Sequence, residues 1–174
     1  MSFESCILLL ISGSYSGTCY VLNVETGERF WTFSAEAAIK SSPYCDDSTG
    51  FVLVGSHDRR CYALNVAERR VVWSYQCKGS IFSSPCVSRN PHCVIIASLA
   101  GVVTALHPVT GDVTWRAHLP KPVFSSPVCD ESRVYVGCVD DCMYALHLAD
   151  GVIRCSSKRG RCDVSRRPSL SSLA

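Results

Sequence analysis

The sequence has no apolar segment long enough to cross a membrane. Its longest uninterrupted apolar run is six residues, from Cys6 to Ile11, whereas a membrane-spanning helix needs about 20. A secretory signal would have a basic start and a longer apolar centre, but the charged residue before this run is Glu4. We therefore predict a cytoplasmic protein that does not bind membranes.

The spacing typical of metal sites and the charge typical of nucleic-acid binding are also missing. None of the 12 cysteines forms a Cys-x-x-Cys pair, which is a common spacing in structural zinc sites. Residues 154–174 hold six Lys and Arg against one acid, so residues 1–153 carry 11 basic and 14 acidic side chains. We therefore expect no metal site and no nucleic-acid partner.

What the sequence does contain is a repeat of 42 residues. Trp31, Trp73 and Trp115 are each 42 residues apart. A Ser-Ser-Pro tripeptide recurs at the same step, beginning at Ser41, Ser83 and Ser125. A fourth, partial copy follows if two residues are deleted after Pro127, and together the copies span residues 5–153. A fixed repeat of this length is typical of propellers and solenoids.

Within each copy the pattern predicts short β-strands. Apolar residues alternate with a period of two and are bounded by Gly, Asp, Asn and Pro. In the third unit we expect four strands, at residues 94–98, 102–107, 113–118 and 123–128. A four-stranded sheet repeated every 42 residues predicts an all-β fold, a partial β-propeller of about 3.5 blades.

The repeated tryptophan predicts how neighbouring blades pack. It follows a turn glycine by four residues, from Gly27 to Trp31 and from Gly111 to Trp115. On an outer strand, an indole can bury about 150–250 Å² against the turn of the next blade. We therefore predict a structural docking role, rather than ligand stacking, for Trp31, Trp73, Trp115, Gly27 and Gly111.

The residues around these tryptophans resemble a known propeller motif. Residues 22–31 and 105–115 are similar to the tryptophan-docking motif of pyrroloquinoline-quinone (PQQ)-type repeats, Ala-x-Asp-x-x-Thr-Gly-x-x-x-Trp. Residues 63–73 form a degenerate copy with Glu68-Arg69 in place of Thr-Gly. Since the chain has neither a Trp-Asp pair nor a Gly-Gly pair, WD-repeat and kelch propellers are excluded.

A closer resemblance is to the carboxy-terminal propeller of the β-alanine-activating enzyme family, which is also known as an acyl-CoA synthetase family and as an aminoadipate-semialdehyde dehydrogenase homologue. The matching segments are residues 39–42, 55–58, 62–64, 82–86, 122–127 and 137–140. The resemblance implies a parent protein in which an adenylate-forming domain and a phosphopantetheine carrier domain precede this propeller.

The catalytic motifs of such a parent are missing from this sequence. It has no Gly- and Ser/Thr-rich phosphate loop with its Lys, and Pro168-Ser169-Leu170 lacks the Asp of a carrier attachment site. Cys155 stands where the fourth docking Trp is expected. We therefore assign no catalytic or cofactor-binding residue, and we expect a propeller fragment at residues 1–153 followed by a basic, serine-rich, disordered tail at residues 154–174.

Two pairs of carboxylates have a simple interpretation. Asp46-Asp47 and Asp140-Asp141 carry the oxygens that calcium binding or acid–base catalysis would need. Both pairs lie in predicted turns, where Asp commonly caps backbone N–H groups. We expect them to be turn caps.

The cysteines and two histidines are likewise expected to be structural. Cysteines at several repeat positions alternate with Val, Met, Ala and Leu, which predicts small, buried, inert thiols. Cys155 and Cys162, in the tail, are the pair most open to oxidation. His107 and His147 share a repeat position with Asn residues just before a turn, so we expect polar turn groups rather than ligands.

These patterns favour one function and leave two alternatives. Since propellers usually have about 4–8 blades, 3.5 copies predict a fragment or short isoform. We expect a non-catalytic scaffold without a cofactor, whose partners are other blades or domains of the full-length protein, or other proteins. One alternative is a fragment of a quinoprotein-type dehydrogenase that binds PQQ and calcium, although no adjacent Cys pair is present. The other is a structural propeller that organises a membrane-associated complex.

Overall fold

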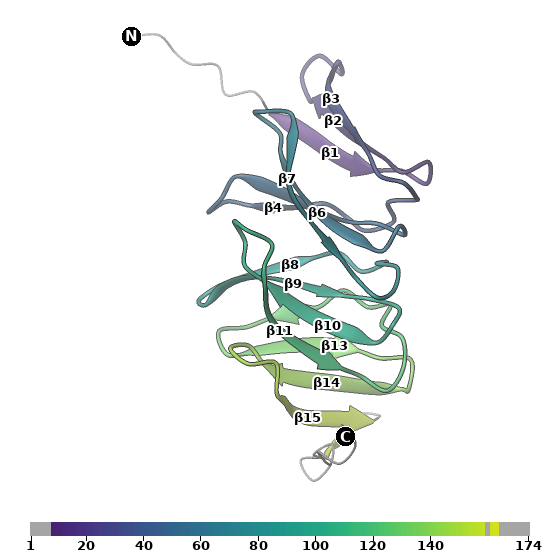
Figure 1. The fold of residues 1–174 in the computed structure, drawn as a ribbon, viewed down its shortest axis with the longest axis vertical. Helices are drawn as coiled ribbons and strands as arrows, with labels where there is room; N and C mark the ends of the chain where they lie inside the picture. The colour runs from purple at the N-terminus through teal and green to yellow at the C-terminus, as the bar shows by residue number, and fades with distance from the viewer. Residues whose placement is uncertain (1–7, 159–160, 164–174) are drawn as a thin grey trace.

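The computed structural model describes residues 8–158 and 161–163. This part of the chain forms 16 antiparallel strands in four sheets and contains no helix. Figure 1 shows the sheets stacked face to face along the long axis in chain order, so that the first and fourth lie at opposite ends. The all-β, propeller-like architecture predicted from the 42-residue repeat is confirmed.

Each sheet follows the same order of strands. The first contains β1 (Leu9–Gly13), β2 (Thr18–Asn23) and β3 (Arg29–Ser34). The second contains β4 (Tyr44–Asp46), β5 (Phe51–Gly55), β6 (Arg60–Asn65) and β7 (Arg70–Gln76). The third contains β8 (Cys86–Arg89), β9 (His92–Ala97), β10 (Val102–Leu106) and β11 (Val113–His118). The fourth contains β12 (Val128–Cys129), β13 (Arg133–Gly137), β14 (Cys142–His147), β15 (Ile153–Lys158) and β16 (Arg161–Asp163).

The core lies between the sheets. Strand β10 is buried at every position, because sheets cover both of its faces. The equivalent strand of the fourth sheet, β14, alternates between buried and more exposed residues, since no other sheet of the described residues covers one of its faces. Met143 is 52% exposed, whereas its repeat equivalents Cys19, Cys61 and Val103 are fully buried. A sheet with apolar residues on both faces therefore buries them only when another sheet packs on each face.

The Ser-Ser-Pro tripeptides connect one sheet to the next. The second serine forms a ladder, in which the Ser42 N–H donates to Ser84 Oγ and the Ser84 N–H donates to Ser126 Oγ, both at 2.9 Å. The first serine closes onto its own sheet: Ser41 Oγ donates to the Gly55 carbonyl at 2.8 Å and accepts from the Gly55 N–H at 2.9 Å. This hydrogen bonding gives the repeated tripeptide a structural role that the sequence pattern left unassigned.

One predicted strand is wrong because it includes a Ser-Ser-Pro tripeptide. Residues 123–128 were expected to belong to the third sheet, but only Val128 and Cys129 are in a strand, β12, and they pair with β13 of the fourth sheet. Ser125 hydrogen-bonds to the Gly137 backbone, Ser126 Oγ accepts from the Ser84 N–H, and Pro127 has no N–H for a sheet. The other three predicted strands of this unit match β9, β10 and β11.

The fourth sheet extends beyond the boundary predicted at residue 153. Strand β15 covers Ile153–Lys158, and Cys155 pairs with Ala145 as Trp115 pairs with Ala105. The strand forms without its tryptophan because backbone hydrogen bonds, which are independent of the side chain, hold it to β14. Most of the predicted tail, residues 159–160 and 164–174, lies outside the described residues.

The hairpin turn of the second sheet generates a stability prediction. Arg59 has φ of +72°, a conformation in which its repeat equivalents are Gly17 and Gly101. Because a Cβ is disfavoured there, we expect Arg59→Gly to stabilise the chain by about 0.5–1 kcal/mol in urea denaturation. Glu131→Gly, in an exposed bend without positive φ, is the control and should destabilise. Equal effects of the two variants would contradict the prediction.

Candidate functional site

The contacts between sheets are made by tryptophan and glycine. The Trp115 indole, on β11, donates from Nε1 to the Leu148 carbonyl at 2.7 Å. Its ring lies on Gly151, where a Cβ would come within 2.4 Å of Cε3. Only glycine can occupy this position, since it also has φ of +70°. The ring therefore packs on a bare backbone turn of the fourth sheet.

Trp73 makes the equivalent contact between the second and third sheets. Its Nε1 donates to the Pro108 carbonyl at 2.9 Å, and a Cβ on Gly111 would lie 2.7 Å from Cδ2. Both tryptophans are only 8% exposed. The sequence predicted a turn at Gly151, which stands at the same repeat position as Gly111, but it did not predict Gly151, Pro108 or Leu148 as docking partners.

The first interface is built differently. Trp31 is only half-buried and makes no side-chain hydrogen bond to the described residues. The turn that it faces has Arg69, with φ of +53°, in place of glycine, and the Arg69 guanidinium lies over the Phe30 ring at 4.7 Å. Gly27 has nothing within 4 Å of its Cβ position. Of the five predicted docking residues, Gly27 therefore receives no indole in this structure.

One carboxylate of each pair caps a backbone N–H, as expected: Asp46, at the end of β4, and Asp140, in a turn, which accepts from the Cys142 N–H at 3.1 Å. Asp46 accepts hydrogen bonds from the Ser48 N–H at 3.2 Å and the Thr49 hydroxyl at 2.7 Å, and it contacts His92 Nε2 at 3.1 Å. Burial would raise the pKa of Asp46, but these hydrogen bonds and the histidine lower it overall. Among the described residues, no group of three or more His, Cys, Asp and Glu side chains is arranged to hold a metal ion.

The histidines also serve the turns. His107 Nδ1 accepts from the backbone N–H groups of Val109 and Thr110, both at 3.3 Å. His147 Nδ1 lies 2.9 Å from Asp150 Oδ1, and that same oxygen accepts from the Val152 N–H. Both rings thus act as the turn groups that their repeat position predicted.

The cysteines differ more than the sequence predicted. Cys19, Cys61 and Cys77 are buried, as expected, and burial raises the pKa of each thiol. Cys45 is exposed, contrary to expectation, because β4 is a short edge strand of its sheet. Cys155 is disulfide-bonded, while the side chain of its expected partner, Cys162, lies outside those described.

One thiol pair spans two sheets. Cys86 on β8 donates to Cys129 on β12, with the sulfurs 3.9 Å apart. This hydrogen bond stabilises a thiolate on Cys129, lowering the pKa of Cys129, and raises the pKa of Cys86. The lowered pKa predicts that Cys129 is the more reactive member of the pair.

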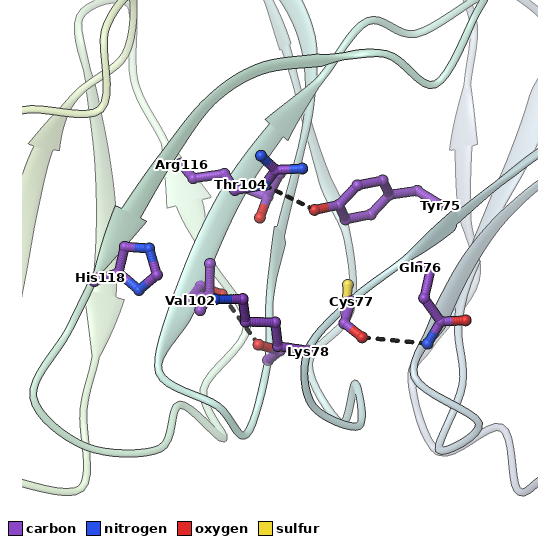
Figure 2. Close-up of a pocket in the computed structure, with 9 residues that line it drawn as sticks. Tyr75, Gln76, Cys77, Lys78, Val102, Thr104, Arg116 and His118 are labelled. Atoms are coloured by element: carbon purple, nitrogen blue, oxygen red, sulfur yellow. Dashed lines mark hydrogen bonds between the residues drawn. The ribbon is translucent and has the colours of Figure 1, made fainter.

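A cavity of about 370 Å³ opens between the second and third sheets. Figure 2 shows Arg116 and His118 of β11 together with Lys78, which follows β7, around Val102 and Thr104 of β10. Tyr75 of β7 accepts a hydrogen bond from Arg116 Nε at 3.0 Å. None of the nine lining residues is acidic. The cavity is therefore lined by buried residues of β10 and by the basic residues Lys78, Arg116 and His118.

The docking contact predicts different losses of stability when two glycines with similar positive φ are replaced by alanine. Gly27→Ala should cost about 1 kcal/mol through its positive φ alone. Gly111→Ala has the same backbone cost and also clashes with the Trp73 ring, so we expect about 3 kcal/mol or more in total. Urea denaturation of both variants measures the difference. Equal losses of stability would show that the indole does not depend on this glycine.

The thiol pair predicts selective alkylation. At pH 7.5 we expect iodoacetamide to modify Cys129 several-fold faster than Cys45, although Cys45 is more exposed, because burial and Asp47 raise the pKa of Cys45. Peptide mass spectrometry over a time course measures both rates. Cys86→Ala should slow alkylation of Cys129 by removing the hydrogen-bond donor. Faster reaction of Cys45 would contradict the assignment.

Comparison with known proteins places this architecture in a family. A family model described as the beta-propeller of the beta-alanine-activating enzyme matches residues 2–168. The search of curated proteins finds no match. Among solved structures, BamB from Moraxella catarrhalis aligns with a TM-score of 0.74 at 18% identity, over 91% of this chain and 50% of that chain.

A second solved structure is similar to the same extent. The computationally designed Ika8 protein aligns with a TM-score of 0.75 at 14% identity, over 86% of this chain and 46% of that one. The chain therefore spans about half the length of these two proteins, and at such identities the likeness concerns the fold alone. The family model covers nearly all of the sequence, and the chain belongs to the β-propeller family of the beta-alanine-activating enzyme.

Proposed function

We propose that this chain is a non-catalytic scaffold, part of the propeller of a protein that resembles the beta-alanine-activating enzyme. The observation that carries the proposal is the family match over residues 2–168. It agrees with the motifs around Trp31 and Trp115, which resemble PQQ-type repeats. In such a parent, an adenylate-forming domain would activate the amino acid or acyl substrate, and this region would hold domains or partners in place.

The polar residues of the chain support a non-catalytic role. Asp46 and Asp140 use their oxygens for backbone and side-chain hydrogen bonds within turns and to neighbouring strands. Acid–base catalysis needs a carboxylate or imidazole directed at a substrate, whereas His107 and His147 are held at turns by local hydrogen bonds. These groups are positioned to shape the blades.

The scaffold proposal extends to partners and location. The other blades and domains of the parent are the proposed partners, because a stacked sheet buries its second face only against another sheet. The exposed Met143 face of the fourth sheet is such a face. We further propose that the protein works in the cytoplasm without a metal or a bound cofactor.

The proposal is tested in the full-length protein encoded by the longest transcript. Beta-alanine-dependent exchange of pyrophosphate into ATP is measured with the intact protein and with a variant that ends before the propeller. We expect the truncated variant to retain the exchange, and this chain alone to have none. Loss of the exchange in a truncated protein that still melts cooperatively would contradict a non-catalytic role, as would calcium-dependent binding of PQQ.

A further inference from the structure

The cavity of about 370 Å³ between the second and third sheets, here called the cleft, lies beside two positions at which the third sheet differs from the second and the fourth. In the second and fourth sheets, a tyrosine hydroxyl donates to an aspartate four residues earlier: Tyr62 to Asp58 at 2.7 Å, and Tyr144 to Asp140. In the third sheet the same two positions are Thr104 and Ala100. One large ring and one carboxylate are therefore missing from this cleft.

The missing ring explains the cavity. Between the first and second sheets, Phe33 packs against Tyr62 with ring centroids 4.8 Å apart. The repeat equivalents in the next cleft are Tyr75 and Thr104. Because threonine is much smaller than tyrosine, Tyr75 has no ring to pack on, and a cavity of about 370 Å³ remains. Its floor is closed by buried Val102 and Thr104.

The missing carboxylate and three basic side chains explain why this cleft is basic. Lys78 stands where the first unit has Glu36, and Arg116 and His118 stand where the second has Ser74 and Gln76. The first cleft contains the acids Glu36 and Asp58, with the Glu36 N–H donating to Asp58 at 3.1 Å, and one cation, Arg60, which donates from Nη1 to Ser74 Oγ at 3.2 Å. The second cleft has no acid among its lining residues. The second cleft therefore has basic residues and no acid, whereas the first has two acids and one base.

The cationic groups are available to a ligand. Within the described part of the chain, the side chains of Lys78 and His118 make no hydrogen bond or ion pair. Arg116 donates from Nε to the Tyr75 hydroxyl, and its guanidinium lies over the Tyr75 ring, 5.7 Å from the centroid. Arg116 thus keeps its terminal N–H groups, which match the geometry of a carboxylate or phosphate. In a cleft lined by charge of one sign, the local concentration of an oppositely charged ligand rises.

We propose that this cleft binds a small organic anion through Arg116, Lys78 and His118. The anionic group, a phosphate or a carboxylate, is bound by these three side chains. An uncharged body lies over Val102 and Thr104, against the Tyr75 ring. The volume is at the lower end of the range for small-molecule sites, about 300–1,000 Å³. The site is independent of the scaffold role proposed above, and either can fail without the other.

The test is a titration of the chain at constant ionic strength. Isothermal calorimetry is run with inorganic phosphate, pyrophosphate and malonate, so that the phosphate and carboxylate arms are compared directly. We expect saturable one-site binding of at least one anion. Arg116→Gln should weaken that affinity at least tenfold. Arg133→Gln, which removes the same charge from an exposed position on β13, is the matched control and should leave the affinity unchanged.

A second variant rebuilds the cleft as the neighbouring repeats have it. Ala100→Asp combined with Thr104→Tyr restores the aspartate and the ring, and we expect it to abolish binding while the protein still melts cooperatively. If this variant does not fold, Lys78→Glu, which copies the first unit at an exposed position, takes its place with the same expected loss. Absence of saturable binding by the unaltered chain, or equal affinities for Arg116→Gln and Arg133→Gln, would overturn the proposal.

Discussion

The structure depends on the packing of one sheet against the next. Each inner sheet has apolar residues on both faces, so it cannot be stable in water as an isolated unit. A tryptophan that lies on the next turn glycine closes the second and third interfaces on the outer side, Trp73 on Gly111 and Trp115 on Gly151. The ladder from Ser42 to Ser84 to Ser126 closes them at the other edge. Because these contacts recur with the 42-residue repeat, the repeat along the chain also fixes how each sheet packs on the next.

A repeat that fixes the packing also leaves positions free to vary. Strand β15 keeps the pairing of the other outer strands although Cys155 replaces the tryptophan, because the backbone ladder tolerates any side chain there. Arg69 can replace a turn glycine where the facing indole is only half-buried. The exchange of an Asp–Tyr pair for Ala100 and Thr104 is another such change, and it creates a cleft without altering the sheet around it.

The repeat positions explain which parts of the site were predictable. The role of tryptophan in docking followed from its 42-residue step, and the turn roles of Asp46 and His107 followed from their place between strands. The glycine on which each tryptophan packs could not be predicted in this way, because the glycine nearest in sequence lies in the same sheet as the tryptophan and not in the next one. The contact between Cys86 and Cys129 could not be predicted either. The two residues are 43 positions apart, one more than the repeat length, so they do not share a repeat position.

By itself, the sequence determined the all-β architecture, the repeat, the turns with positive φ and the family resemblance, because these depend on local patterns of apolar, glycine and aromatic residues. Only the tertiary structure decided which sheet each segment joins, as for Val128 and Cys129, and which thiols and cations face one another. A cavity or a lowered pKa results from what two neighbouring sheets place opposite each other. The absence of a tyrosine at Thr104 has a consequence only beside Tyr75, Arg116 and Lys78.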